Sequence, residues 1–227
     1  MSTALVIEND PAQGLGRAAA WLAEAGMELD TVRPHLGEAV PNSAGGHDAL
    51  IALGGGRGKD WSDELGGLME TAVADTTPVF AVCSSARMLA AAFGGVVEDR
   101  DEPFGPRMLA KRDAAGRDLI FGPAPMTIDV IRWRRQELVE LPPEATLLAA
   151  SPQGALEIFR IRDTAWGVQS HFEFTPEQLA GFGDFDESAL AKAAEVDEHI
   201  VNTWKPILQR FARVAAGERK ALPVLDA

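Results

Sequence analysis

The stretch PVFAVCSSARMLAAAF, residues 78–93, decides the fold, because it joins a short apolar run to an alanine-rich segment with helical periodicity. Residues 78–83 predict a buried strand, and a helix follows directly. Cys83 stands at the junction, where a strand-to-helix elbow exposes a side chain at the carboxyl edge of a sheet. Such an elbow turns sharply, and its neighbours two positions away, Ala81 and Ser85, are both small.

The same alternation of strand-like runs and helical patterns precedes this stretch. Apolar runs over 4–7 and 49–53 predict strands, and residues 15–25 and 63–73 predict helices. This order predicts a parallel sheet covered by helices on both faces. After residue 96 the segments become shorter and are broken by prolines, and we expect antiparallel strands to be added there. The strands expected in this part cover 126–131, 146–150, 155–161 and 166–170.

Residues 186–216 predict a long terminal helix with an apolar stripe, which Pro206 is expected to kink. Such a stripe is more often part of a core than of an interface, although it also suits a dimer contact. We see no composition shift that marks a domain boundary. We therefore expect one domain over residues 1–227, with this helix as a C-terminal extension.

Composition excludes several classes of protein. The chain has 34 acidic and 21 basic residues and a net charge of -13. This charge disfavours binding to nucleic acid or to an anionic membrane, because both are polyanions. Its single cysteine excludes an internal disulfide and a Cys-rich metal cluster, and we expect no metal and no cofactor. No apolar run approaches the ~20 residues of a membrane span. The first residues lack the basic region of a signal peptide, so we expect a cytoplasmic protein.

Cys83 is a candidate nucleophile because of its place in the chain. The N-terminus of a helix carries partial positive charge and free N–H groups, which lower the pKa of a thiol and can hold an oxyanion. The alternative is a buried structural cysteine, which is the commoner role of a free thiol. Taken alone, the segment favours that alternative.

A second segment, WGVQSHFE at 166–173, supplies the partners that a nucleophile needs. On an extended backbone residues i and i+2 point to the same side, so Glu173 can orient His171 and stabilise its imidazolium. The alternative is a histidine at a strand end beside a solvated glutamate. The other three histidines have no comparable neighbourhood.

A third segment, LGGGRG at 53–58, follows a predicted strand, and its flexible amides can approach a reacting carbonyl closely. It does not fit a phosphate-binding loop, because Leu53 and Asp60 occupy the first and last positions of that motif. The pattern GLGRAA at 14–19 weakly matches a dinucleotide-binding loop. However, it is separated from the preceding strand, and no acidic residue ends a second strand at the required distance.

Together these segments resemble the class I, triad-type glutamine amidotransferase family, over residues 5 to about 176. The family elbow G-x-C-x-G-x-Q reads AVCSSAR at 81–87, and the family motif H-P-E reads HFE at 171–173, followed by FTPE. The glycine loop matches the family's G-G-P-x-G strand end, with Gly56 in the proline position. The resemblance implies a flavodoxin-like α/β three-layer sandwich, with a mainly parallel central sheet and antiparallel additions.

The resemblance also implies a mechanism, in which a cysteine thiolate attacks a carboxamide and forms a thioester. It assigns the triad to Cys83, His171 and Glu173, and the oxyanion hole to backbone N–H groups of Gly55, Gly56 and Ser84. The histidine protonates the leaving ammonia and then activates water. In the family the ammonia passes to a synthetase partner.

The residues that should recognise glutamine depart from the family pattern. The elbow glutamine aligns with Arg87, and the His and Asp of the family's W-H-x-D align with Arg134 and Gln136. That acid recognises the α-ammonium group in the family, so its loss should weaken the contact. Arg87, Arg134 and Arg135 are expected near the pocket, where guanidinium groups suit carboxylate or phosphate, or else on the surface as ordinary exposed arginines. The predicted substrate-binding residues are Arg87, Arg134, Arg135 and Gln136.

Three functions are consistent with this sequence. The first is a glutamine-cleaving amidotransferase subunit with a synthetase partner. The second keeps the same triad but takes another amide or acyl substrate, which the arginine substitutions favour. The third is a non-catalytic scaffold that binds a partner, which the changed substrate motifs favour and the intact triad opposes. A homodimer is compatible with all three.

Overall fold

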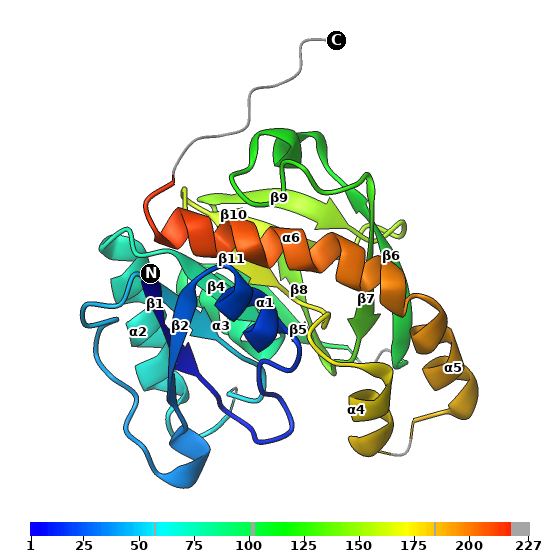
Figure 1. Ribbon diagram of the computed structural model, residues 1–227, viewed down its shortest axis with the longest axis horizontal. Coiled ribbons are helices and arrows are strands. Elements are labelled where there is room, and N and C mark those ends of the chain that lie inside the picture. The colour runs from blue at the N-terminus through cyan, green and yellow to red at the C-terminus, as the bar shows by residue number, and fades with distance from the viewer. Residues whose placement is uncertain (57, 101–102, 184, 219–227) are drawn as a thin grey trace.

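The computed structural model describes residues 1–56, 58–100, 103–183 and 185–218, and a nine-stranded sheet forms the middle of this described part (Figure 1). Its strand order is β2-β1-β3-β4-β11-β10-β9-β6-β7. The parallel part consists of β1 (Ser2–Ile7), β2 (Met27–Val32), β3 (Ala49–Ala52), β4 (Val79–Val82) and β11 (Ala165–Val168). The antiparallel part consists of β6 (Gly105–Lys111), β7 (Thr127–Arg132), β9 (Ala145–Ala150) and β10 (Leu156–Ile161). The predicted α/β fold, mainly parallel with antiparallel additions, is confirmed.

Helices cover both faces of the sheet, because the parallel strands are apolar on both sides. Helices α1 (Ala18–Glu24) and α6 (Asp197–Ala215) pack together on one face, where α6 lies across the sheet in Figure 1. Helices α2 (Ser62–Ala74) and α3 (Ser84–Ala92) pack together on the other. Side chains of β1 alternate accordingly: Val6 joins the core beneath α1 and α6, whereas Leu5 joins the core beneath α2 and α3.

A small second sheet lies outside the predicted elements. It pairs β5 (Val96–Asp99) with β8 (Gln136–Glu140) in antiparallel register, and Asp99 lies directly opposite Gln136. Strand β5 is short and largely exposed, so it carries no apolar run that a sequence pattern would detect. The sequence pattern does not predict strands β2 and β6 either, because they also lack a continuous apolar run.

The C-terminal part differs from the single helix that the sequence predicts. The chain forms α4 (Pro176–Gly181), α5 (Glu187–Glu195) and then α6, and the break between α5 and α6 falls at Val196. Helix α6 continues through Pro206. Its apolar stripe is buried against the sheet, where Trp204 stacks on Phe172 with ring centroids 4.0 Å apart. No helix among the described residues is both long and apolar enough to cross a bilayer.

Candidate active site

Cys83 occupies a strained turn between β4 and α3, as the elbow pattern predicts. Its backbone has φ 56° and ψ -118°, a positive-φ conformation that non-glycine residues adopt rarely and at a cost of about 1–3 kcal/mol. Ser85 fits the tight turn because its side chain folds back, with Oγ donating to the carbonyl of Leu53 at 2.5 Å. The elbow is therefore tied directly to the end of β3. This is the conformation that presents a nucleophile at the edge of a sheet.

His171 and Glu173 follow β11 and form a hydrogen-bonded pair. His171 Nδ1 donates to Glu173 Oε1 at 2.7 Å, and the Phe172 backbone N–H donates to Glu173 Oε2 at 2.8 Å. The backbone of His171 is fixed by two hydrogen bonds with Ile131, at the end of β7. Glu173 therefore holds the imidazole ring through its Nδ1, as the third member of a triad does.

The other ring nitrogen of His171, Nε2, is buried and makes no hydrogen bond of ordinary geometry to the residues that the structure describes. It nevertheless lies near enough to Cys83 Sγ for the two side chains to govern each other's ionisation. Burial by itself would raise the pKa of Cys83, but the positive charges of His171 and Arg87, together with the hydrogen bond from Arg87, outweigh it and lower the pKa from 9.0 to about 6. Burial by itself would lower the pKa of His171, but Cys83 and Glu173 raise it to about 10.

These two shifts define the charge state of the site near neutral pH. Between about pH 6 and about pH 10 the favoured form is a thiolate beside an imidazolium. A thiolate is the nucleophilic form of cysteine, and an imidazolium is the proton donor that an amide leaving group requires. The pair therefore has the protonation states that a nucleophile and a general acid require.

Arg87 is a second cation at the sulfur. It lies one helical turn after Cys83 on α3, it is 4% exposed, and its Nη2 donates to Cys83 Sγ at 3.8 Å. Arg87 occupies the position that the family pattern gives to glutamine. The structure thus places a permanent positive charge against the candidate nucleophile.

The glycine loop lies beside the elbow, and close packing requires its glycines. A Cβ on Gly54 would overlap Gln13 and reach 3.3 Å from the Cβ of Cys83. A Cβ on Gly55, whose φ is +85°, would overlap Asp10. Gly55 and Ser84 both line the hollow in front of the sulfur. Gly56, the third predicted oxyanion donor, is not among the lining residues of this hollow, and a Cβ on it would meet Asn9 and Leu65.

A hollow of about 1150 Å³ opens in front of Cys83, and all four predicted substrate-binding residues line it. Its described lining residues are Gln13, Gly55, Cys83, Ser84, Arg87, Asp99, Arg100, Pro103, Phe104, Trp133, Arg134, Arg135 and Gln136. The hollow is wide enough for a small amino-acid amide. The structure thus brings Arg87 to the same place as the consecutive residues Arg134, Arg135 and Gln136, which lie far from it in the sequence.

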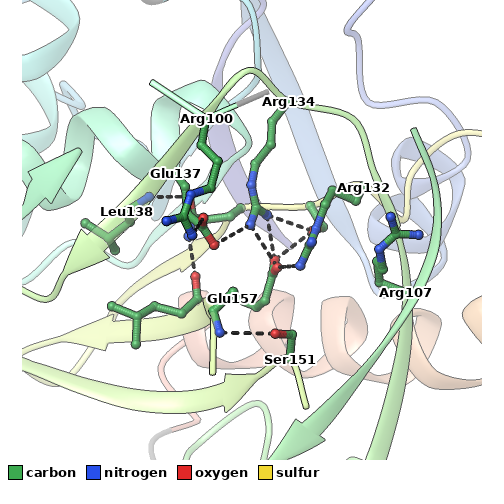
Figure 2. A network of polar contacts seen from close by, with 12 residues as sticks. Arg100, Arg107, Arg132, Arg134, Glu137, Leu138, Ser151 and Glu157 are labelled. Atoms are coloured by element: carbon green, nitrogen blue, oxygen red, sulfur yellow. Dashed lines mark hydrogen bonds and ion pairs between the residues drawn. The ribbon is translucent and has the colours of Figure 1, made fainter. Parts of the chain in front are cut away.

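Arg134 reaches this hollow but its guanidinium group is engaged elsewhere (Figure 2). It donates to both carboxylate oxygens of Glu157, at 2.8 and 3.0 Å, and to Glu137 at 3.1 Å. Glu157 is completely buried and also accepts hydrogen bonds from Arg132 at 2.5 Å and Ser170 at 2.8 Å. This cluster joins the end of β7, strand β10 and the residue before His171. Arg134 thus holds the wall of the site together.

Sequence reasoning missed Arg17, which secures the segment that carries Glu173. Its Nε donates to the carbonyl of Phe172 at 3.1 Å, its Nη2 to that of Phe174 at 2.6 Å, and its Nη1 to Asp197 at 2.7 Å. A Cβ on the preceding Gly16, whose φ is +50°, would overlap the carbonyl of Glu173. The glycine-containing pattern at 14–19 therefore serves close packing against the candidate triad. The glycine-containing pattern is visible in the sequence, but Phe172, which Arg17 contacts, lies 155 positions later.

Sequence reasoning also missed Asp99 and Arg100, which line the hollow from β5 and the turn after it. Both lie in a polar stretch, EDRDEP at 98–103, whose composition is typical of an ordinary surface turn. Their place in the site depends on the pairing of β5 with β8. No local sequence pattern predicts the pairing of these two strands.

Comparison with known proteins agrees with this geometry. The profile of the family described as glutamine amidotransferase class-I matches residues 19–180. The glutamine amidotransferase-like protein YfeJ of Salmonella typhimurium is 23% identical over 197 residues, covering 82% of each chain. Aminodeoxychorismate synthase of Streptomyces griseus is 36% identical over 117 residues, which are 48% of this chain but 16% of the synthase.

Among solved structures, a glutamine amidotransferase of Methylobacillus flagellatus superposes with a TM-score of 0.80 at 18% identity, covering 100% of this chain and 99% of the other. At that identity the likeness concerns the fold. The family profile covers well over half of the chain and includes the elbow and the histidine segment. The chain therefore belongs to the class-I glutamine amidotransferase family.

Proposed function

We propose that this protein is a cysteine-dependent amidotransferase subunit that cleaves the side-chain amide of glutamine to glutamate and ammonia. Cys83 is held in a strained elbow and stabilised as a thiolate, while the Glu173-bound imidazole of His171 lies beside it as an imidazolium. This charge distribution is the one that the first step of amide cleavage needs.

In the first step the Cys83 thiolate attacks the amide carbon, and a C–S bond forms. The negative charge that develops on the amide oxygen is held by backbone N–H groups of the glycine loop (Gly55, Gly56) and of Ser84 at the N-terminus of α3. His171 gives its Nε2 proton to the amide nitrogen, the C–N bond breaks, and ammonia leaves. The enzyme is then a glutamyl thioester with a neutral imidazole.

In the second step His171 accepts a proton from water, and the resulting hydroxide attacks the thioester carbon. The C–S bond breaks, glutamate is released, and the sulfur leaves as a thiolate beside the regenerated imidazolium. Through its 2.7 Å hydrogen bond to Nδ1, Glu173 stabilises the imidazolium both before the first step and after the second. The remaining predicted contacts to substrate come from Arg87, Arg135 and Gln136, because the buried guanidinium group of Arg134 is engaged with Glu157 and Glu137.

The ammonia would be consumed by a synthetase. Aminodeoxychorismate synthase of Streptomyces griseus matches this chain over a small part of its length, so a related segment there belongs to a much larger protein. We propose that this protein delivers ammonia to a synthetase partner, either as a single chain or as a homodimer. We propose no role for a metal or a cofactor.

A second candidate function keeps the chemistry and changes the substrate. Arg87 contacts the sulfur, and Arg134 and Gln136 are engaged with Glu157 and Asp99. These positions thus present guanidinium and amide groups where the family pattern has a glutamine, a histidine and an acid. An amide or acyl donor with a carboxylate and without an amine would suit such a surface.

The test is covalent capture on the one cysteine of the chain. The protein is incubated with glutamine and with a panel of other amides and thioesters, and intact mass is recorded with ammonia release. A glutamyl adduct on the wild type, absent from Cys83→Ser, together with ammonia release, is the expected result. If only another donor forms an adduct, that donor and not glutamine is the substrate. No adduct from any donor, tested with and without candidate synthetases, would overturn catalysis and leave a binding scaffold.

A further inference from the structure

The hollow in front of Cys83 contains one carboxylate among its described lining residues, that of Asp99. Asp99 is the last residue of β5, and Gln136, the first residue of β8, lies directly opposite it in the antiparallel pair. Gln136 Nε2 donates to Asp99 Oδ1 at 2.7 Å. The Asp99 side chain makes no other hydrogen bond to the residues that the structure describes, so this carboxylate retains acceptor sites facing the hollow.

The charges around Asp99 are complementary to an α-amino acid. Arg100 and Arg135 line the same hollow. Arg100 is half exposed and shares its guanidinium group with Glu137 at 2.9 Å, whereas Arg135 is exposed. A free amino acid carries an ammonium and a carboxylate on one carbon, and it therefore needs a carboxylate and a guanidinium group side by side. Asp99 and its arginine neighbours provide that pair.

Gln136 cannot supply the negative charge, because its side chain is neutral and its amide nitrogen is a donor. It can hold Asp99 in place, since its Nε2 already bonds one oxygen of that carboxylate. We propose that Asp99 binds the α-ammonium group of the substrate, oriented by Gln136 across the β5–β8 pair. The substrate class is then an amide that carries an α-ammonium group, glutamine foremost, and the amine-free substrates of the second candidate function are disfavoured.

This inference rests on the proposed function for its substrate, and its test separates the two. Kinetics compare L-glutamine with glutaramate, which has the same amide and carboxylate but no ammonium group. In the wild type glutamine is preferred. Asp99→Asn lowers kcat/KM for glutamine by about 10- to 100-fold, the effect of losing one charge-assisted hydrogen bond, and acts mainly through KM. The same variant leaves glutaramate unchanged.

The matched control is Glu98→Gln, which removes an equal charge from the adjacent residue of the same strand. Because neighbouring side chains of a strand point to opposite sides, this variant keeps the wild-type preference. A rescue variant, Asp99→Asn combined with Gln136→Asp, returns a carboxylate to the opposite strand. It is expected to recover at least part of the preference for glutamine.

A readout without turnover uses Cys83 itself. Glutamine or glutaramate is added while iodoacetamide alkylates the thiol, and protection is followed by intact mass. Glutamine is expected to protect the wild type at lower concentration than glutaramate, and Asp99→Asn is expected to abolish the difference. Equal protection by both compounds, or a difference that survives in Asp99→Asn, overturns the role of Asp99. If no ammonia is released yet the protection differs as expected, the proposed function fails and the assignment of Asp99 stands.

Discussion

The state of one sulfur atom decides what this site can do, and two neighbours control it. The charges of His171 and Arg87 lower the pKa of Cys83 against the opposing effect of burial. Replacing Arg87 with glutamine, the residue of the family pattern, removes a charge 3.8 Å from the sulfur. We predict that the pKa of Cys83 rises from about 6 by about 1 to 3 in Arg87→Gln.

Thiolate absorbance at 240 nm measures this change directly, because the chain has one cysteine and no tyrosine. Arg87→Lys retains the charge and is expected to titrate close to the wild type. Arg135→Gln removes a charge from the same hollow but from an exposed side chain, and is expected to have a smaller effect. An unchanged titration in Arg87→Gln would show that His171 alone stabilises the thiolate.

At the level of elements, strand β10 holds the two sides of the site together through Glu157. Burial by itself would raise the pKa of this carboxyl, but hydrogen bonds and charges from Arg134 and Arg132 and a hydrogen bond from Ser170 lower it. Glu157→Gln leaves two buried guanidinium groups without their shared carboxylate. We predict a loss of about 3–5 kcal/mol in the free energy of unfolding, measured by urea denaturation.

The pH dependence of that loss has a definite sign. Because folding lowers the pKa of Glu157, its contribution is present above the pKa of the unfolded carboxyl and disappears as the pH falls through the folded value. The difference between wild type and Glu157→Gln should therefore shrink in acid. Glu144→Gln breaks the exposed ion pair with Arg162 and serves as the matched control, with little effect expected. Equal effects of the two variants would rule out a special role for the buried cluster.

At the scale of the whole molecule, α6 closes the core over the sheet and reaches the segment that carries the candidate triad. Trp204 is fully buried, stacks on Phe172 and donates from Nε1 to the carbonyl of Asp129 at 2.9 Å. Phe172 lies between His171 and Glu173 in the chain. Trp204→Ala removes this contact and leaves a cavity, and we predict a loss of about 3–5 kcal/mol in the free energy of unfolding.

Circular dichroism during urea denaturation follows this loss without depending on tryptophan emission. His199→Ala lies on the same helix but at an exposed position, and its unfolding midpoint should match that of the wild type. A Trp204→Ala protein as stable as the wild type would mean that α6 is dispensable for the core. That result would also reopen the alternative in which the apolar stripe serves a dimer contact.

Local sequence patterns are enough to predict the alternation of strands and helices, the elbow and the histidine segment. Strand β4 is a continuous apolar run, Cys83 follows it directly, and Glu173 is two residues from His171. Apolar periodicity and i, i+2 geometry involve only a few neighbouring residues, so they can be read from a single sequence. The long terminal helix was predicted in outline, but its break at Val196 was not.

The long-range contacts that build and support the site follow only from the tertiary structure. Asp99 meets Gln136 through the pairing of two short strands, Arg17 reaches Phe172 and Phe174 across most of the chain, and Glu157 joins β7 to the segment before His171. Each contact depends on long-range register, and each uses polar residues that look like ordinary surface residues in the sequence. A buried charge is tolerated only where its partners are brought to it, and folding of the whole sheet is what brings them together.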